Sequence, residues 1–222
     1  MINLKDVTIV SVTGIDSKNH IRAIKYSSQH INFGAKKLIT SEKITDNDVE
    51  IINIGDMDYV EYSRFLVYDL GDFIDTSHAL IVQSDGYVVN PNEWNEKFLD
   101  FDYIGAPWPL PKDNFSYRDP KGNLCRVGNG GFSLRSKKLL MLAKELNLEW
   151  KDYFGFYNED GFYCCHQRES YENNGCKFAP IEIASIFSQE NIIEENKNLT
   201  PFGFHGKNNH YFKETQPFLL NF

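Results

Sequence analysis

Four short polar or glycine-rich segments carry the side chains of this sequence that could do chemistry. In chain order they are Gln83-Ser84-Asp85-Gly86, Gly128-Asn129-Gly130-Gly131-Phe132, Glu159-Asp160-Gly161 and Phe204-His205-Gly206. Each segment lies beside an apolar run. Together they supply a carboxylate, a permissive backbone, a pair of acids and a lone imidazole, which are the groups needed to handle a metal-bound phosphate ester.

The first segment begins at the last residue of 79–83, an apolar run typical of a strand buried on both faces of a parallel sheet. Open α/β sheets bind ligands at the carboxyl ends of their strands. Asp85 is therefore predicted to lie at the edge of a crevice. A turn aspartate that bonds its own backbone before Gly86 is the alternative interpretation.

The acid pair Glu159-Asp160 lies between two aromatic segments, Tyr153 to Tyr157 and Phe162-Tyr163. Partial burial beside a ring-shaped ligand would raise the pKa of a carboxyl group and suit it to general-base catalysis. Solvated acids are the alternative. His205 lies between glycine-flanked aromatic residues, where a neutral imidazole could complete the coordination of a divalent cation, although a lone histidine is often structural.

The glycine segment and one tryptophan each have two interpretations. Three glycines within residues 128–131 either let the backbone approach a ligand closely or form a tight turn. Their spacing matches neither a P-loop nor a dinucleotide-binding fingerprint, which argues against a nucleoside triphosphatase and a dehydrogenase. Trp108 stands between two prolines in a loop predicted over 101–126, as an aromatic platform or as a core residue.

The elements that would position these residues alternate between strand and helix. Strands are predicted at 7–12, 37–40, 50–54, 79–83 and 132–135, from β-branched and apolar runs. Helices are predicted from Asp16 or Ser17 to about His30, over Tyr59 to Phe73 by apolar spacing, and after a cap at Ser136. This order predicts an α/β protein.

Composition narrows the class of protein. The 222 residues are 41% hydrophobic and 24% charged, which is ordinary globular usage, and we expect one domain. A net charge of -8 argues against nucleic acid or an anionic membrane as partner. We expect no transmembrane segment and no secretory signal, because no suitable apolar run is present. The four cysteines match no metal-binding pattern, which favours reduced thiols in a cytoplasmic protein.

The four segments, in this order, resemble the nucleotide-sugar-dependent glycosyltransferases of the GT-A fold, and more closely a family of small uncharacterised GT-A-like proteins. Three further stretches carry the resemblance: Asp102-Tyr103-Ile104-Gly105-Ala106-Pro107-Trp108, residues 127–136 and residues 201–206. The resemblance implies a single GT-A-type, Rossmann-like domain over residues 1–222, with a mixed, mostly parallel central sheet flanked by helices.

The resemblance also implies a role for each segment. In such enzymes an Asp-x-Asp motif binds Mn2+ or Mg2+, which holds the diphosphate of the donor. Asp85 matches the last acid of that motif and His205 the second metal ligand, whereas Gln83 replaces the first acid and could bond a ribose hydroxyl without adding charge. Asp160 would be the catalytic base and Glu159 its acceptor-binding neighbour. The implied donor-binding residues are Thr13, Arg22, Arg64, Gln83, Ser84 and Gly86, and the implied sugar- or acceptor-binding residues are Trp108, Asn129, Gly130 and Gly131.

The implied activity is metal-dependent transfer of a sugar from a nucleotide-diphosphate donor, with uridine diphosphate favoured, to a hydroxyl of a glycan, glycolipid or glycoprotein acceptor. An opposed base gives inversion by single displacement. One alternative is a catalytically silent carbohydrate-binding protein on the same fold, suggested by Gln83 in place of an acid. A nucleotidyltransferase is less consistent with the sequence, because the glycine-rich basic loop it needs after Val12 is missing.

Overall fold

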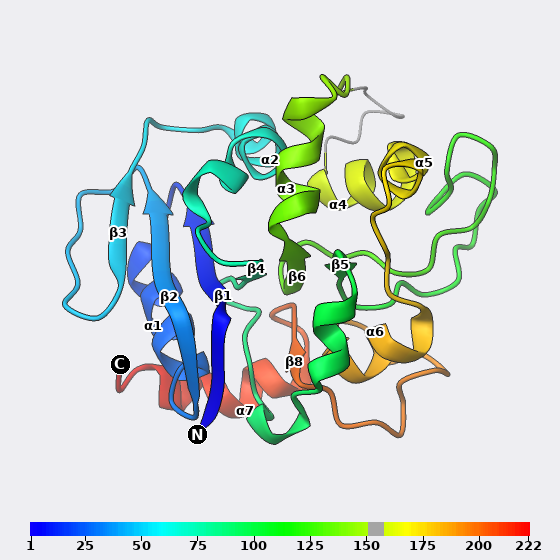
Figure 1. Ribbon diagram of the computed structural model, residues 1–222. Coiled ribbons are helices and arrows are strands. Elements are labelled where there is room, and N and C mark those ends of the chain that lie inside the picture. The colour runs from blue at the N-terminus through cyan, green and yellow to red at the C-terminus, as the bar shows by residue number, and fades with distance from the viewer. Residues whose placement is uncertain (151–157) are drawn as a thin grey trace.

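The structure is a computed structural model that describes residues 1–150 and 158–222. Within these residues a six-stranded sheet has the order β3-β2-β1-β4-β6-β5 (Figure 1). β1 is parallel to β2 and β4, β2 is parallel to β3, and β6 is antiparallel to both β4 and β5. The expected mixed, mostly parallel sheet is confirmed. The strands are β1 Ile2–Thr13, β2 Ile31–Thr40, β3 Glu50–Asn53, β4 His78–Ile81, β5 Tyr103–Ile104 and β6 Ser133–Ser136.

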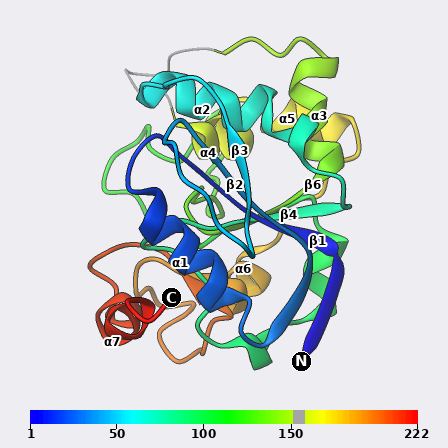
Figure 2. The same cartoon turned by 90° about the vertical axis from the view of Figure 1, so that its left-hand side faces the viewer.

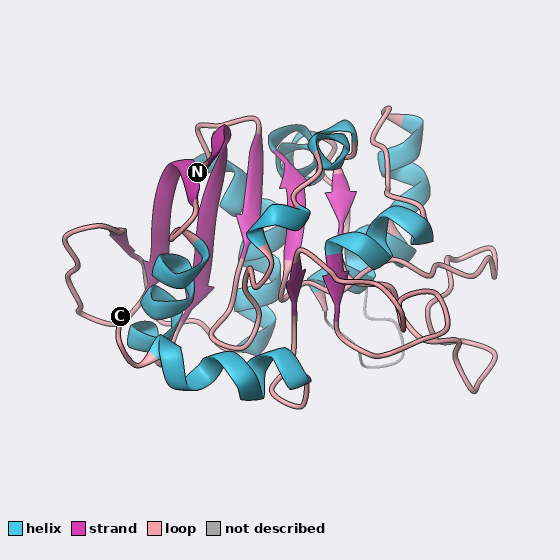
Figure 3. Cartoon of the chain, turned by 90° about the horizontal axis from the view of Figure 1, so that it is seen from below, coloured by secondary structure: helices cyan, strands magenta, loops and turns pink. Residues whose placement is uncertain are grey.

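Helices cover both faces of this sheet. In Figure 2, α2 and α3 lie on one side of the strands, and α1 and α7 on the other. The longer helices are α1 Ser17–Ser27, α2 Tyr59–Tyr68, α3 Lys137–Glu145, α5 Arg168–Asn173, α6 Ile181–Phe187 and α7 His210–Leu219. Shorter turns are η1 Leu70–Phe73, η2 Pro91–Glu93, η3 Glu96–Asp100, α4 Glu159–Gly161 and η4 Phe162–His166, and two further strands, β7 Ser188–Gln189 and β8 Gly203–Phe204, pair in parallel. Seen from below in Figure 3, helices flank the strands on both sides.

The alternation of side chains along β1 explains the two layers of helices. Val10 belongs to a buried cluster with Leu66 of α2 and Leu140 of α3. Ile9, its neighbour in the strand, belongs to a separate cluster that includes Ile24 of α1. Successive residues of a strand point to opposite faces, so an unbroken apolar run buries both sides of the sheet. This burial fixes the sheet whose edge carries the candidate site.

Several predicted elements differ in extent from the observed ones; the strand expected at 37–40, for example, covers Ile31–Thr40. The helix expected to reach about His30 ends at Ser27, because the chain must turn before β2 begins at Ile31. The helix expected over Tyr59 to Phe73 is divided into α2 and η1. The loop expected over 101–126 contains the short strand β5. The aromatic segment Tyr153 to Tyr157 lies outside the described residues.

Two further findings concern the cysteines and the helices. Cys125, Cys164, Cys165 and Cys176 are all buried free thiols. Among the helices that the structure describes, none combines the length and the apolar character needed to cross a bilayer.

Candidate active site

The topology brings the first two predicted segments to one edge of the sheet. After β4, Gln83 and Gly86 close a tight turn through two backbone hydrogen bonds of 2.8 and 3.1 Å. Because β6 is antiparallel to β4 and pairs Ser133 with Ile81, the glycine segment before β6 lies beside this turn. Asp85 and the glycines, over 40 positions apart in the sequence, therefore meet where β4 ends.

The small sheet of β7 and β8 adds the histidine. Its register pairs Gln189 with Phe204, so the residues that follow, Glu190 and His205, emerge side by side. The backbone N–H of Gly206 donates to the carbonyl of Asp85 at 2.8 Å, which ties this segment to the turn after β4. The fourth predicted segment is thus held against the first by backbone bonds.

Polar atoms from three segments surround the imidazole of His205. Its Nε2 lies 3.2 Å from Oε1 of Gln83 and 3.8 Å from Oδ1 of Asp85. Its Nδ1 lies 3.3 Å from Oε1 of Glu190 and 3.0 Å from Nδ2 of Asn129. Burial opposes the charged imidazole, but the hydrogen bond to Glu190 and the charge of Asp85 outweigh burial and raise the pKa of His205.

Two glycines are required for this packing. A methyl group at Gly131 would lie 2.1 Å from Nε2 of His205, and one at Gly130 would lie 1.7 Å from Oε1 of Glu159. Both distances are far below van der Waals contact, so neither position accommodates a side chain while its neighbour stays in place. Asn129 contacts His205 and lines a cavity together with Trp108. Its backbone is left-handed, with φ of 66°. The glycine segment is therefore a close-packed turn between the acid pair and the imidazole.

The residues around His205 suit a divalent cation. Asp85, Gln83 and His205 offer a carboxylate, an amide oxygen and an imidazole nitrogen, a mixed O and N set compatible with Mn2+ or Mg2+. Within the residues that the structure describes, no group of three or more His, Cys, Asp or Glu side chains forms a metal site by itself.

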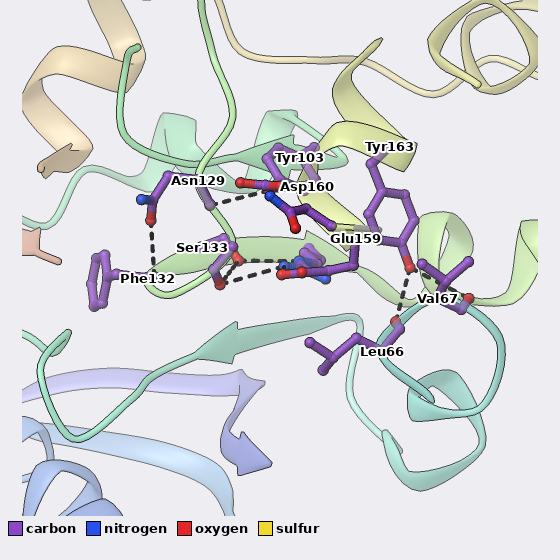
Figure 4. A network of polar contacts seen from close by, with 12 residues as sticks. Leu66, Val67, Tyr103, Asn129, Phe132, Ser133, Glu159, Asp160 and Tyr163 are labelled. Atoms are coloured by element: carbon purple, nitrogen blue, oxygen red, sulfur yellow. Dashed lines mark hydrogen bonds and ion pairs between the residues drawn. The ribbon is translucent and has the colours of Figure 1, made fainter. Parts of the chain in front are cut away.

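Glu159 makes a contact different from the expected one. Its side chain is buried and lies 3.1 Å from Nη2 of Arg135, whose side chain is fully buried. The guanidinium also rests against the rings of Tyr103 and Tyr163. Figure 4 shows Glu159 beside Ser133 and Tyr163, at the centre of a polar network. This pairing gives Glu159 a structural contact, and its acceptor contact stays a prediction of the resemblance.

Asp160, the other acid, faces a cavity. It is half-buried and lines a space of about 660 Å³ together with Asn129 and Glu190. Its Oδ1 accepts a hydrogen bond from the backbone of Gly161 at 2.7 Å. Burial, and secondarily the charge of Glu159, raise the pKa of Asp160 to about 7. A carboxylate with this proton affinity, open to a cavity, can accept a proton near neutral pH.

The other residues predicted to bind the donor are Ser84, Thr13, Arg22 and Arg64. Ser84 lies in the turn that carries Asp85, and Thr13 ends β1, where its hydroxyl bonds the backbone of Ile15. Arg22 donates to Asn19 within α1. Arg64 is exposed on α2 with its guanidinium over the ring of Tyr68, and its donor contact stays a prediction.

Trp108 is also placed differently from an open platform. Its side chain is only 6% exposed and stacks on Tyr117, with ring centroids 4.6 Å apart and planes within 14°. A methyl group at Gly128 would lie 1.9 Å from Cζ2 of its indole. Trp108 is thus enclosed between the glycine segment and Tyr117, which agrees with the core interpretation.

Several residues of the site were not predicted. Tyr62 of α2 accepts a hydrogen bond from Nε2 of Gln83 at 2.9 Å, and thereby orients the amide oxygen toward His205. The sequence places Arg135 only in a predicted strand, and neither Arg135 nor Glu190 is among the predicted site residues. A strand prediction at residues 188–189 would have indicated Glu190, since it follows the strand directly.

The fold is shared with solved glycosyltransferases. The structure superposes on the galactosyltransferase LgtC, solved with donor and acceptor sugar analogues and as an active-site mutant, with a TM-score of 0.53, 13% identity, and coverage of 89% of this chain and 86% of LgtC. It superposes on a glycosyltransferase involved in glycosylation of the major capsid of PBCV-1 with a TM-score of 0.50, 12% identity, and coverage of 97% and 99%. Similarity at this identity establishes the fold, which is the GT-A type. No curated protein matches the chain.

The family assignment comes from a sequence model. Residues 57–205 match the model described as protein of unknown function DUF5672, and the chain belongs to this family. The matched range includes the turn with Asp85, the glycine segment, the acid pair and His205.

Proposed function

We propose that this protein is a metal-dependent glycosyltransferase that moves a sugar from a nucleotide-diphosphate donor to a hydroxyl acceptor. The observation that carries the proposal is the convergence of Asp85, Gln83 and His205 at the edge of the sheet, next to a cavity that contains Asp160. A cation-binding set and a base of suitable pKa are the two components that such a transfer requires.

The donor would bind where β1 and β4 end. Asp85, Gln83 and His205 would hold Mn2+ or Mg2+, which when bound supplies charge neutralisation for the departing diphosphate. Gly130 and Gly131 let Glu159 and His205 pack directly against the backbone, so this set lies beside the acid pair with no side chain between them. Uridine diphosphate is the carrier we favour, with Thr13 at the end of β1 on the nucleotide side.

The acceptor would bind in the cavity next to Asp160. The acceptor oxygen forms a bond to the anomeric carbon, the bond from that carbon to the phosphate oxygen breaks, and the hydroxyl proton moves to Asp160. The nucleoside diphosphate leaves with the electron pair of the broken bond. A base positioned across the sugar from the leaving group gives inversion. Arg135 and Glu159 hold the start of α4, and so fix the position of Asp160.

The test is turnover by the purified protein. With Mn2+ and a panel of uridine and guanosine diphosphate sugars, we expect release of nucleoside diphosphate, and loss of that release in Asp85→Asn and in Asp160→Asn. The control is Asp48→Asn, at an exposed surface ion pair with Lys36. Turnover unchanged in either site variant would contradict the assigned roles, and an unchanged anomeric configuration in the product would contradict inversion.

A second candidate function is supported by one observation. Gln83 stands where the resemblance places an acid, and its amide bonds Tyr62 and approaches His205 without adding charge. A carbohydrate-binding protein without turnover would tolerate this loss of charge. Calorimetry that detects glycoside binding but no metal-dependent binding of a nucleotide sugar would favour this candidate.

A further inference from the structure

Tyr117 has a backbone conformation that is unusual for an aromatic residue. Its φ is 55°, in the left-handed region that side chains with a Cβ rarely adopt. Its carbonyl accepts a hydrogen bond from the backbone N–H of Cys125 at 2.6 Å, which closes the loop around it. Strained residues of this kind persist where the surrounding structure fixes them, often in ligand sites.

The ring of Tyr117 is supported by a second aromatic ring. It stacks on Trp108, which is itself packed against Gly128, so the two rings form a layered wall. Both aromatic residues line the cavity of about 660 Å³ that contains Asp160. Burial raises the pKa of Tyr117, and the charges of Glu190 and Asp160 raise it further. Tyr117 therefore lines the space next to the proposed base, with Trp108 stacked on its ring.

The rest of the cavity wall combines apolar residues, among them Phe115 and Pro120, with hydrogen-bonding groups. Asn114, Asn129 and Asn158 contribute amides, and Asp160 and Glu190 contribute carboxylates. Amides and carboxylates bond hydroxyl groups, while an aromatic ring packs against the C–H face of a sugar ring. An alkyl chain in this space would desolvate these polar groups without replacing their hydrogen bonds. Aromatic surface beside amides and carboxylates is the combination that a saccharide needs, with its C–H faces on the rings and its hydroxyl groups on the polar side chains.

The charges of the cavity wall indicate which class of saccharide it can bind. Asp119, Asp160 and Glu190 line the cavity, against a single arginine, Arg118, whose Nη1 donates to the carbonyl of Gly122. An anionic sugar would bring a carboxylate toward this acidic wall, and like charges in a partly buried site repel.

From these observations we propose that Tyr117 is the platform for a saccharide acceptor, and that the acceptor sugar is neutral or carries an amine. The proposal rests on the function proposed above, in which Asp160 receives the acceptor proton. It selects glycans among the possible acceptors and assigns a binding residue in a loop that the proposed chemistry does not otherwise use.

The experiment is saturation-transfer NMR on the full chain with Mg2+ and uridine diphosphate present. The probes are the methyl glycosides of glucose, galactose, mannose and glucosamine, the matched methyl glucuronide, and N-acetylserine methylamide. We expect at least one neutral or amino glycoside to bind, and the glucuronide to bind at least about ten-fold more weakly.

Two variants separate the ring from the hydroxyl. Tyr117→Asn should weaken glycoside binding by about ten-fold or more, because the stacking surface is lost. Asparagine tolerates the left-handed backbone, so the loop can keep its conformation. Tyr117→Phe should bind within about three-fold of the unmodified protein if stacking dominates. The control is Phe218→Ala, which removes an exposed aromatic residue of α7.

The proposal is overturned if no glycoside binds, if Tyr117→Asn binds as well as the unmodified protein, or if the glucuronide or the serine derivative binds most tightly. Thermal shifts with uridine diphosphate and Mg2+, measured on the same proteins, distinguish failure of the acceptor proposal from failure of the proposed function. A metal-dependent shift that survives in Tyr117→Asn leaves the proposed function standing while the glycoside data decide the role of Tyr117. No shift in the unmodified protein would count against the proposed function itself.

Discussion

At the scale of single residues, the two acids of the pair have separate tasks although they are adjacent in the chain. Glu159 is buried against Arg135, whereas Asp160 faces the cavity with a pKa raised to about 7. The charge of Glu159 contributes to that raised pKa. Burial, and after it the charge of Glu159, thus bring the pKa of Asp160 toward the value that a general base needs near neutral pH, while the charge of Arg135 partly opposes this rise.

The first prediction concerns the pH dependence of turnover. Only the ionised form of Asp160 can accept a proton, so kcat/KM should rise with pH and level off above about pH 7. Asp160→Asn should reduce kcat by about 100- to 10,000-fold and remove this limb. The measurement is a pH–rate profile at saturating metal. A profile without a rise between pH 6 and 8 would count against Asp160 as the base.

The second prediction concerns stability. Because the pKa of Asp160 in the folded protein lies above its ordinary value of 3.8, the folded state binds this proton more tightly than the unfolded state. The free energy of unfolding should therefore decrease between about pH 4 and pH 7 through this group. At pH 8, Asp160→Asn should be more stable than the unmodified protein by about 1–2 kcal/mol, and at pH 4 it should not. Urea unfolding at both pH values checks the sign.

The third prediction concerns the buried ion pair. Glu159→Gln leaves the guanidinium of Arg135 buried without a compensating charge, so the free energy of unfolding should fall by about 3 kcal/mol. The matched control is Glu172→Gln, which removes the exposed partner of Arg168 and should cost less than about 1 kcal/mol. Equal losses in the two variants would show that Glu159 does not hold the site together.

At the scale of elements, the glycine segment before β6 has no side chains at Gly130 and Gly131, which lets Glu159 and His205 pack against its backbone. In Gly131→Ala the new methyl group would meet Nε2 of His205 at 2.1 Å, so the imidazole must move away from Asp85. The affinity for Mn2+ in the presence of uridine diphosphate should then fall by about ten-fold or more, which corresponds to about 1.4 kcal/mol. Electron paramagnetic resonance of free Mn2+ measures this. Gly55→Ala is the control, because a methyl group there meets nothing within 4 Å.

The elements themselves were largely predictable from local patterns. The β-branched run at residues 7–12 lies in β1, the apolar run at 79–83 overlaps β4, and Ser136 caps α3 by accepting from the backbone of Leu139. Each of these signals is contained in a few consecutive residues. The turn that carries Asp85 could therefore be assigned to the end of the strand that precedes it, where the structure has it.

The contacts missed by sequence reasoning depend on geometry that no local pattern contains. Glu190 reaches His205 only through the register of two strands of two residues each. Tyr62, and not Arg64, reaches Gln83, because the face that α2 turns toward the site is set by its packing on the sheet. Arg135 was predicted in a strand, but its ion pair with Glu159 joins segments 24 positions apart.

At the scale of the whole molecule, the fold gathers segments from the middle and the end of the chain at one edge of the sheet. The turn after β4, the glycine segment, the acid pair and the segment after β8 all lie within the part of the chain matched by the family model. The same GT-A fold occurs in glycosyltransferases that share only 12–13% of their residues with this protein. The site, more than the fold, therefore has to carry the functional inference.

The most direct measurement is the melting temperature of the purified protein with Mn2+, with uridine diphosphate, and with both. If Asp85 and His205 grip one cation that holds a diphosphate, each addition alone should give little change, and the two together should raise the melting temperature by mass action. Asp85→Asn should abolish the joint effect. Stabilisation by the nucleotide that is the same with and without metal, or that survives in Asp85→Asn, would contradict a metal-held leaving group.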